Sequence, residues 1–224
     1  MRPTRRDFLQ ASAVAGVVGV TPLSASDTFE SEPKIMMPTE RAKALMALFG
    51  LKYPIFEAPH GRATSPELAI AVSHSGAMGA LANLRAAEDA RVAVSKVRVT
   101  AKGSFFVNFL LATVPMSGNE PAPLRAALEA GAPVVQFSWG MPTKQAISAI
   151  RGADAKVGMQ VTSRDSARAA LDLGADYLVC QGTEAGGHVQ ATRGLYEALA
   201  IVLDEAKDKP VVASGGIGNG RAIR

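Results

Sequence analysis

Short apolar segments alternate with longer amphipathic segments along most of the chain from residue 39 onward. The apolar segments lack the polar alternation of a half-exposed strand, which is typical of parallel strands buried on both faces. The amphipathic segments carry apolar residues at helical spacing, and several begin at Ser or Thr and end at Gly. We predict strands at 54–58, 78–82, 105–111, 133–138, 156–161, 177–180 and 210–214. We predict helices at 39–50, 65–74, 87–97, 123–130, 143–150, 163–173 and 194–207.

Strands that are each followed by a helix predict an α/β fold, and their number favours a TIM-type (β/α)8 barrel. The segment 218–224 follows the last predicted strand and resembles the opening of a helix, and an eighth strand is not found. We therefore expect 39–224 to form an incomplete barrel, truncated after about seven strands. A doubly wound sheet that never closes is the structural alternative.

The first residues differ from this pattern. Arg5 and Arg6, followed by Asp7, Phe8 and Leu9, precede a run of small apolar residues at 11–20. A basic start, a short apolar middle and a small-residue end predict a twin-arginine export signal over 1–26, with a linker over 27–38. We therefore expect export by the twin-arginine translocation machinery to a bacterial periplasm. A weakly amphipathic N-terminal helix or tail is the alternative.

Composition and charge narrow the function classes. Lys and Arg exceed Asp and Glu by 24 to 20, only 5% of residues are aromatic, and the basic residues do not cluster, so a nucleic-acid partner is not expected. No apolar run reaches the ~20 residues needed to cross a bilayer. One Cys and three His cannot form an intrachain disulfide or a Cys-rich zinc site, so we expect no metal.

Glycines and carboxamides gather where the predicted strands end, which is the face that carries the active site in such barrels. These candidate residues, in chain order, are Ala58, Pro59, His60, Asn108, Gln160, Gln181, Gly186, Gly187, His188, Gly215 and Gly216. Amide side chains and glycines suit a flat, hydrogen-bonding ligand that needs close backbone approach. Cys180 lies within an apolar strand, where a buried and inert thiol is expected.

These residues resemble the nitronate monooxygenases, formerly called 2-nitropropane dioxygenases. The resemblance runs from about residue 48 to residue 224, and its most specific part is Gln181-Gly182-x-Glu184-Ala185-Gly186-Gly187-His188. Supporting matches are Ser65-Pro66-Glu67-Leu68-Ala69 with Ser75-Gly76, Val107-Asn108, and Val211-Val212-Ala213-Ser214-Gly215-Gly216-Ile217. The resemblance implies a barrel that binds FMN without a covalent link and oxidises alkyl nitronates and nitroalkanes with O2. It also implies that His188 is the catalytic base.

The chemistry of the residues agrees with this implication. A neutral imidazole, with an ordinary pKa of about 6.5, can remove the acidic α-proton of a nitroalkane that is held beside it. Gly186 and Gly187 would let the loop pack against the flavin ring. Asn108, Gln160 and Gln181 would hydrogen-bond to the edge of the ring.

The remaining candidates are expected to contact the flavin mainly through their backbone. Gly215 and Gly216, just before a predicted helix, would present N–H groups to the FMN phosphate. Ala58, Pro59 and His60 would contact the cofactor from the first strand, although the family usually has Met where this chain has His60.

Several alternatives stay open at this point. An NADH-dependent enoyl-acyl-carrier-protein reductase of the same fold shares a Gly-Gly-His loop. A non-catalytic remnant, or a domain completed by a partner chain, would follow from the incomplete barrel. His188 could be a surface-loop residue, Asn108 could cap a turn, and the oligomeric state is left open.

Overall fold

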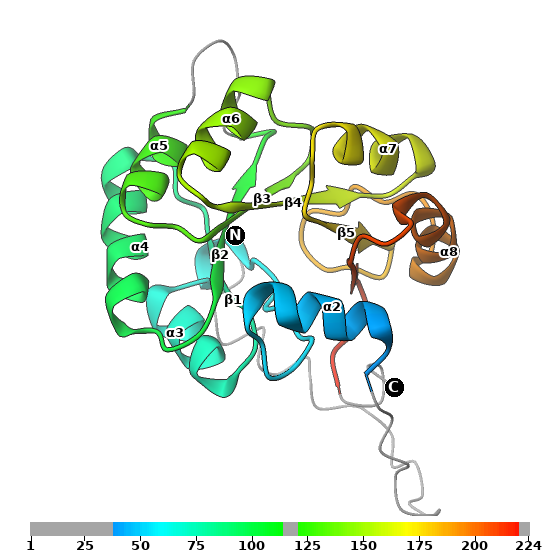
Figure 1. Ribbon diagram of the computed structural model, residues 1–224, viewed down its shortest axis with the longest axis horizontal. Coiled ribbons are helices and arrows are strands. Elements are labelled where there is room, and N and C mark those ends of the chain that lie inside the picture. The colour runs from blue at the N-terminus through cyan, green and yellow to red at the C-terminus, as the bar shows by residue number, and fades with distance from the viewer. Residues whose placement is uncertain (1–37, 114–120, 220–224) are drawn as a thin grey trace, which may run out of the picture. The chain divides into compact units, whose positions relative to one another are not determined.

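The computed structural model describes residues 38–113 and 121–219, which form a parallel sheet with helices along its outer face (Figure 1). The predicted export signal at 1–26 and all but the last residue of the predicted linker at 27–38 lie outside the described residues. Both therefore remain predictions. Among the described residues, no helix is long and apolar enough to span a membrane.

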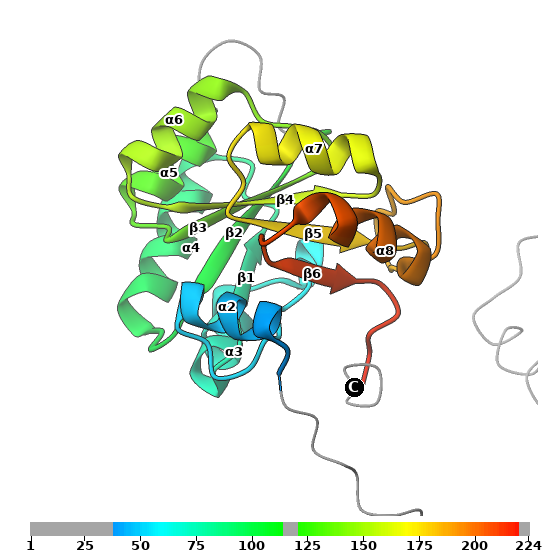
Figure 2. The ribbon, with the colours of Figure 1, turned by 45° about the vertical axis from the view of Figure 1, so that its right-hand side comes forward.

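Six strands form one sheet whose spatial order is the same as their order in the sequence, and all neighbours are parallel. They are β1 (Gly79–Ala82), β2 (Phe105–Leu110), β3 (Val134–Ser138), β4 (Lys156–Val161), β5 (Tyr177–Gln181) and β6 (Val211–Ser214). This order, with a helix between successive strands, confirms the predicted TIM-type barrel architecture and excludes a doubly wound sheet, in which the strand order reverses. Figure 2 shows the strands turning around a common axis.

One predicted strand is wrong. The segment 54–58 contributes only an isolated parallel bridge between Phe56 and Met78, beside β1. Pro54 and Pro59 flank the bridge, and a proline has no N–H to donate to a neighbouring strand. Within the described residues, no strand connects this edge of the sheet to β6 at the other edge.

The predicted helices are confirmed to within a few residues. The structure has α2 (Glu40–Phe49), α3 (Pro66–Ser75), α4 (Ala87–Thr100), α5 (Ala122–Glu129), α6 (Lys144–Gly152), α7 (Arg164–Asp172) and α8 (Leu195–Ala206), and a short 3-10 helix η1 (Gly61–Ala63) that was not predicted. The side chains of Thr39, Ser65, Thr143 and Ser163 each accept a hydrogen bond from a backbone N–H of the helix that follows. These caps satisfy N–H groups that have no partner inside the helix.

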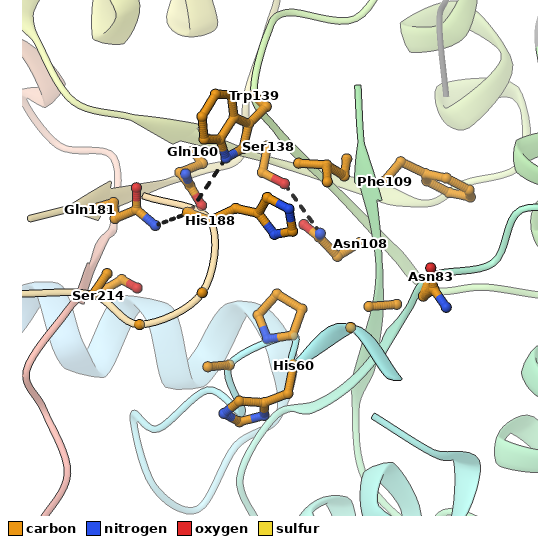
Figure 3. A pocket seen from close by; sticks show the side chains of 18 of the residues that line it. His60, Asn83, Asn108, Phe109, Ser138, Trp139, Gln160, Gln181, His188 and Ser214 are labelled. Atoms are coloured by element: carbon orange, nitrogen blue, oxygen red, sulfur yellow. Dashed lines mark hydrogen bonds between the residues drawn. The ribbon is translucent and has the colours of Figure 1, made fainter. Parts of the chain in front are cut away.

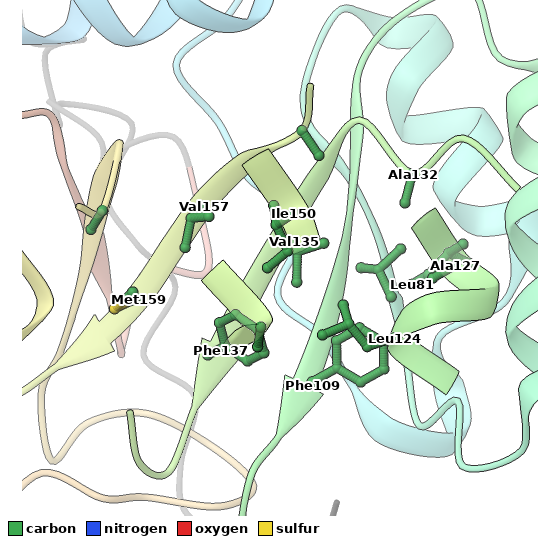
Figure 4. Packing of buried hydrophobic residues seen from close by; sticks show 14 of the residues in the cluster. Leu81, Phe109, Leu124, Ala127, Ala132, Val135, Phe137, Ile150, Val157 and Met159 are labelled. Atoms are coloured by element: carbon green, nitrogen blue, oxygen red, sulfur yellow. The ribbon is translucent and has the colours of Figure 1, made fainter. Parts of the chain in front are cut away.

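Alternate residues of each strand point to opposite faces of the sheet. The outward residues pack against the helices in one buried cluster, and Figure 4 shows Val135, Phe137 and Val157 on the side of the strands where the helix with Ile150 lies. The inward residues near the amino ends of the strands form a second cluster with α2. Its centre is aromatic, because the Tyr177 ring meets the rings of Phe49 and Phe56 at centroid distances of 5.3 and 5.5 Å.

Candidate active site

A cavity of about 610 Å³ opens at the carboxyl ends of the strands. Every candidate residue taken from the sequence lines it: Ala58, Pro59, His60, Asn108, Gln160, Gln181, Gly186, Gly187, His188, Gly215 and Gly216. They come from loops and strand ends that span more than 150 positions of the chain, and the parallel order of the strands brings them to one face. The structure therefore shows these residues together, while their roles remain predictions.

His188 lies on the loop between β5 and α8, and its main chain is tied to two strand ends. Its carbonyl oxygen accepts hydrogen bonds from Gln181 Nε2 at 3.2 Å and from Trp139 Nε1 at 3.4 Å (Figure 3). The ring of Trp139 meets the His188 ring edge-on, with 6.3 Å between centroids. Gly186 and Gly187 give the preceding backbone conformational freedom. These contacts nevertheless hold the imidazole at the cavity.

Gln190 fixes the end of the same loop, and no motif in the sequence singled it out. Its Oε1 accepts hydrogen bonds from the backbone N–H of Trp139 at 2.9 Å and from Gln160 Nε2 at 3.0 Å. Its own backbone N–H donates to Gln181 Oε1 at 2.8 Å. Gln190 therefore connects the ends of β3, β4 and β5, and both polar atoms of the Gln181 amide hold this loop.

Trp139 is in the left-handed backbone region, with φ of 61°. A non-glycine residue in this region is strained, typically by about 1 kcal/mol or more. The turn lets the Trp139 N–H reach Gln190 while its ring reaches His188. The interactions with the His188 loop thus compensate the strain.

Glu184, in the middle of the octet, has a structural role. Helix α8 begins after Gly194, which has no side chain to cap it, and Glu184 Oε2 instead accepts the backbone N–H of Leu195 at 2.9 Å. A Cβ on Gly182 would stand 2.4 Å from the Leu195 nitrogen and 2.5 Å from Glu184 Oε2. Gly182 and Glu184 therefore anchor the start of the loop to α8.

Gly215 and Gly216 follow β6 and have left-handed backbone angles, with φ of 123° and 70°. A Cβ on Gly215 would stand 2.9 Å from the Ala185 nitrogen, and one on Gly216 would stand 3.1 Å from Glu184 Cβ. Both glycines are thus required where they pack against the His188 loop. Most of the helix predicted after them, at 218–224, lies outside the described residues, so the proposed phosphate contact remains a prediction.

Asn108 belongs to a line of buried polar side chains that crosses the inner face of the sheet. Tyr177 Oη donates to Gln136 Oε1 at 3.0 Å, Gln136 Nε2 donates to Asn108 Oδ1 at 3.1 Å, and Asn108 Nδ2 donates to Ser138 Oγ at 3.2 Å. Burial raises the pKa of Tyr177, which keeps its hydroxyl neutral. Asn108 therefore holds a strand-borne network and does not merely cap a turn.

His60 lies on the opposite side of the cavity from His188 (Figure 3). Its backbone N–H donates to Thr64 Oγ1 at 2.7 Å, which fixes the turn before η1. Nearby Glu57 accepts the backbone N–H of Ala80 through Oε2, and its Oε1 is buried with no hydrogen-bond partner in the described part of the chain. Burial raises the pKa of Glu57, against the opposing effects of the Ala80 N–H and the charge of His60.

The cavity also contains residues that sequence reasoning missed, in particular Asn83, Arg85 and Ser138. Arg85 Nε donates to Asn83 Oδ1 at 3.1 Å. Arg85 follows β1 by three positions, so its place just beyond a strand end was the available signal. Among the described residues that line the cavity there is a guanidinium and there are two imidazoles, but there is no carboxylate. This charge distribution favours an anionic ligand.

The chain matches the family model described as nitronate monooxygenase over residues 42–224. It belongs to the nitronate monooxygenase family. The curated nitronate monooxygenase of Pseudomonas aeruginosa is 30% identical, over 79% of this chain and 62% of that relative. A probable nitronate monooxygenase of Staphylococcus aureus is 29% identical, over 80% of this chain and 62% of that relative. The chain thus spans less than two thirds of the length of these relatives.

Solved structures agree with the family assignment. A nitroalkane oxidase from Streptomyces ansochromogenes has a TM-score of 0.64 and 32% identity, covering 78% of this chain and 61% of that chain. A FabK mutant from Thermotoga maritima has a TM-score of 0.71 and 28% identity, covering 80% of this chain and 58% of that chain. The family assignment supports an oxidoreductase.

The residues of the cavity fit a flavin, the cofactor expected from the resemblance to nitronate monooxygenases. The cavity volume of about 610 Å³ lies within the ~300–1,000 Å³ typical of cofactor sites. A Cβ on Gly186 or Gly187 would meet no atom of the described residues within 4 Å, so no described residue occupies the space that they face. The amides of Asn108 and Gln160 and the guanidinium of Arg85 offer polar groups for the ring edge and the phosphate.

The described residues contain no group of three or more His, Cys, Asp or Glu side chains that could hold a metal ion. Cys180 is buried, and burial raises the pKa of its thiol to about 11. A thiol with that pKa is almost fully protonated at neutral pH, so it is a poor nucleophile, as the sequence predicted.

Proposed function

We propose that this chain is an FMN-dependent oxidoreductase that oxidises alkyl nitronates and nitroalkanes with O2, with His188 as the general base. The observation that carries the proposal is that one cavity holds His188, the carboxamides and the glycine pairs of the family motif. Family membership supports the reaction class. Because the chain spans about 62% of its curated relatives, the activity of the whole protein is part of the proposal.

The flavin would supply the electron acceptor when bound, and the protein supplies binding, orientation and the base. The His188 imidazole would accept the α-proton of a neutral nitroalkane on a ring nitrogen. The guanidinium of Arg85 would stabilise the resulting anion. The described lining residues include no carboxylate that would repel it. The hydrogen bonds from Gln181 and Trp139 to the His188 carbonyl would hold the ring at the substrate carbon.

The test compares a substrate that needs a base with one that does not. His188→Asn should lower the turnover of nitroethane by about 100- to 10,000-fold, while oxidation of pre-formed ethyl nitronate stays within a few-fold, as measured by O2 uptake with FMN present. His74→Asn makes the same change on α3, where His74 Nε2 contacts the Thr100 carbonyl, and should change neither rate. Equal losses on both substrates would remove the general-base role.

Two further outcomes would replace the proposal. Rapid anaerobic bleaching of the flavin by NADH would favour the enoyl-acyl-carrier-protein reductase alternative. Folded wild-type protein that binds no flavin and oxidises neither substrate would favour the non-catalytic alternative. Export through the twin-arginine pathway and a periplasmic location remain part of the proposal, and protease protection of the full chain in spheroplasts would test them.

A further inference from the structure

The polar line across the inner face of the sheet has a defined direction. Asn108, Gln136, Gly158 and Tyr177 are aligned in one row across β2, β3, β4 and β5. Gly158 leaves room for the tyrosine, because a Cβ there would stand 2.1 Å from Tyr177 Cζ. The Tyr177 hydroxyl can therefore reach over β4 to Gln136.

The tyrosine determines the direction of every hydrogen bond in the line. Its side chain is fully buried, and Gln136 is its hydrogen-bond partner in the described part of the chain. A buried O–H without an acceptor is destabilising, so Tyr177 donates and Gln136 presents Oε1 to it. Gln136 must then donate from Nε2 to Asn108 Oδ1, which turns Asn108 Nδ2 toward Ser138 Oγ.

Ser138 stands at the end of this line and at the wall of the cavity. Its side chain is 5% exposed, and its Oγ accepts from Asn108, so its own proton is not used in that bond. Within the described residues, Ser138 Oγ has no other hydrogen-bond partner. Ser138, Asn108 and His188 line the same cavity, and Figure 3 shows their side chains facing a common space.

We propose that Ser138 Oγ donates a hydrogen bond to a nitro or nitronate oxygen of the substrate while His188 acts on the α-carbon. This inference rests on the proposed function for the identity of the ligand. Negative charge moves onto the nitro oxygens when the α-proton leaves, so a donor fixed at that point stabilises the charge as it develops. Tyr177, Gln136 and Asn108 are positioning residues, since they act through Ser138.

A nitro compound that cannot react tests this contact directly. 2-Methyl-2-nitropropane has no α-proton, and its nitro stretch can be isolated by the difference between ¹⁴N and ¹⁵N samples on the FMN-saturated full chain. The stretch of the probe bound to the wild type should lie at lower frequency than that of the probe in an apolar solvent, and Ser138→Ala should remove this shift. Ser138→Thr should retain it, because threonine keeps the hydroxyl. Ser148→Ala, on the exposed side of α6, should match the wild type.

Two further measurements separate the loss of the Ser138 hydroxyl from a change in the direction of its hydrogen bond. Ser138→Ala should lower kcat/KM for nitroethane by about 10- to 100-fold, as expected for a hydrogen bond to a charged group. Tyr177→Phe should broaden the nitro band, since Ser138 could then also donate to Asn108. Circular dichroism would verify that each variant is folded.

The outcomes distinguish this inference from the proposed function. A shift that depends on Ser138 in a protein without nitroalkane turnover would support the contact and contradict the proposed activity. Turnover by the wild type with a shift that Ser138→Ala leaves unchanged would overturn the contact alone. No shift, or no binding of the probe by folded wild-type protein, would also overturn it.

Discussion

The two sides of the cavity are built differently. One side, here called the hydrogen-bonded wall, consists of strand-borne polar side chains: Asn108, Ser138, Gln160 and Gln181, each less than 9% exposed and each in a hydrogen bond to another residue of the site. The other side, here called the glycine wall, consists of Ala58, Pro59, His60, Gly215 and Gly216. In the chain, Ala58, Pro59 and His60 come after the isolated bridge at one edge of the sheet, and Gly215 and Gly216 come after β6 at the other edge.

Burial follows the same division. All residues of β3 and β5 are buried, whereas all residues of β6 are only partly buried. A second cavity, of about 1,090 Å³, separates β6 and α8 from α2 and the 54–59 segment. The side chains that need a fixed direction thus lie where the sheet is fully packed. The residues expected to contact the cofactor mainly through their backbone lie at the edges of the sheet.

We expect the strongest effect from a substitution at Gly158, which would disturb the packing of Tyr177 and so the hydrogen-bonded wall. Gly158→Ala would place a Cβ 2.1 Å from the Tyr177 ring, so we expect the free energy of unfolding to fall by about 3 kcal/mol, the upper part of the range for overpacked cores. Urea denaturation would measure this change. Gly152→Ala, at the end of α6, meets no atom within 4 Å and should leave stability unchanged or slightly higher. Equal stability of the two variants would contradict the packing of Tyr177 over Gly158.

A smaller effect is expected when the His188 loop loses hydrogen bonds but His188 itself is unchanged. Gln190→Leu removes an acceptor used by two donors, and we expect kcat/KM for nitroethane to fall by about 10- to 100-fold with little change in stability, because small displacements of a catalytic group are costly. Gln190→Glu keeps an acceptor at this place and should retain most of the activity. Gln145→Leu, exposed on α6, is the matched control. Equal losses in both Gln190 variants would contradict the role of this acceptor oxygen in holding the loop.

The smallest effect concerns the carboxyl group beneath the glycine wall. Because burial raises the pKa of Glu57, the folded protein binds this proton more tightly than the unfolded chain does. The free energy of unfolding therefore falls as pH rises from the ordinary value of 4.5 through the raised value, and it then stays constant.

Glu57→Gln cannot titrate, and it keeps an oxygen for the Ala80 N–H. It should lose this fall with pH and be slightly more stable than the wild type above the window. Thermal unfolding at several pH values measures the difference. Glu88→Gln, on the exposed first turn of α4, makes the same change elsewhere. A pH dependence that persists in Glu57→Gln would contradict the burial of this carboxyl.

Much of the fold could be predicted from the sequence because its signals are local. Buried apolar runs gave β1 to β6, and Ser or Thr before helices and Gly after them gave the helix ends. The segment 54–58 had the same apolar character, but whether an apolar run pairs over its length depends on its neighbours, and here only Phe56 does.

The site could be predicted only where its residues belong to a local motif. The octet that ends at His188 and the glycines after β6 are such motifs. Gln190 is different, because its side-chain partners Trp139 and Gln160 lie 51 and 30 positions away in the sequence. Gln136 and Ser138 have the two-residue spacing of one strand face, but their partnership with Asn108 and Tyr177 depends on the register of four strands.

We propose that the cavity at the strand ends binds a flavin. Titration of the purified full chain with FMN, followed by quenching of flavin fluorescence, tests it most directly, with Gly186→Val as the variant that fills the space beside His188. We predict saturable binding of one flavin per chain by the wild type and weaker binding by the variant. Folded wild-type protein that leaves the fluorescence of FMN unchanged would contradict a flavin site in this cavity.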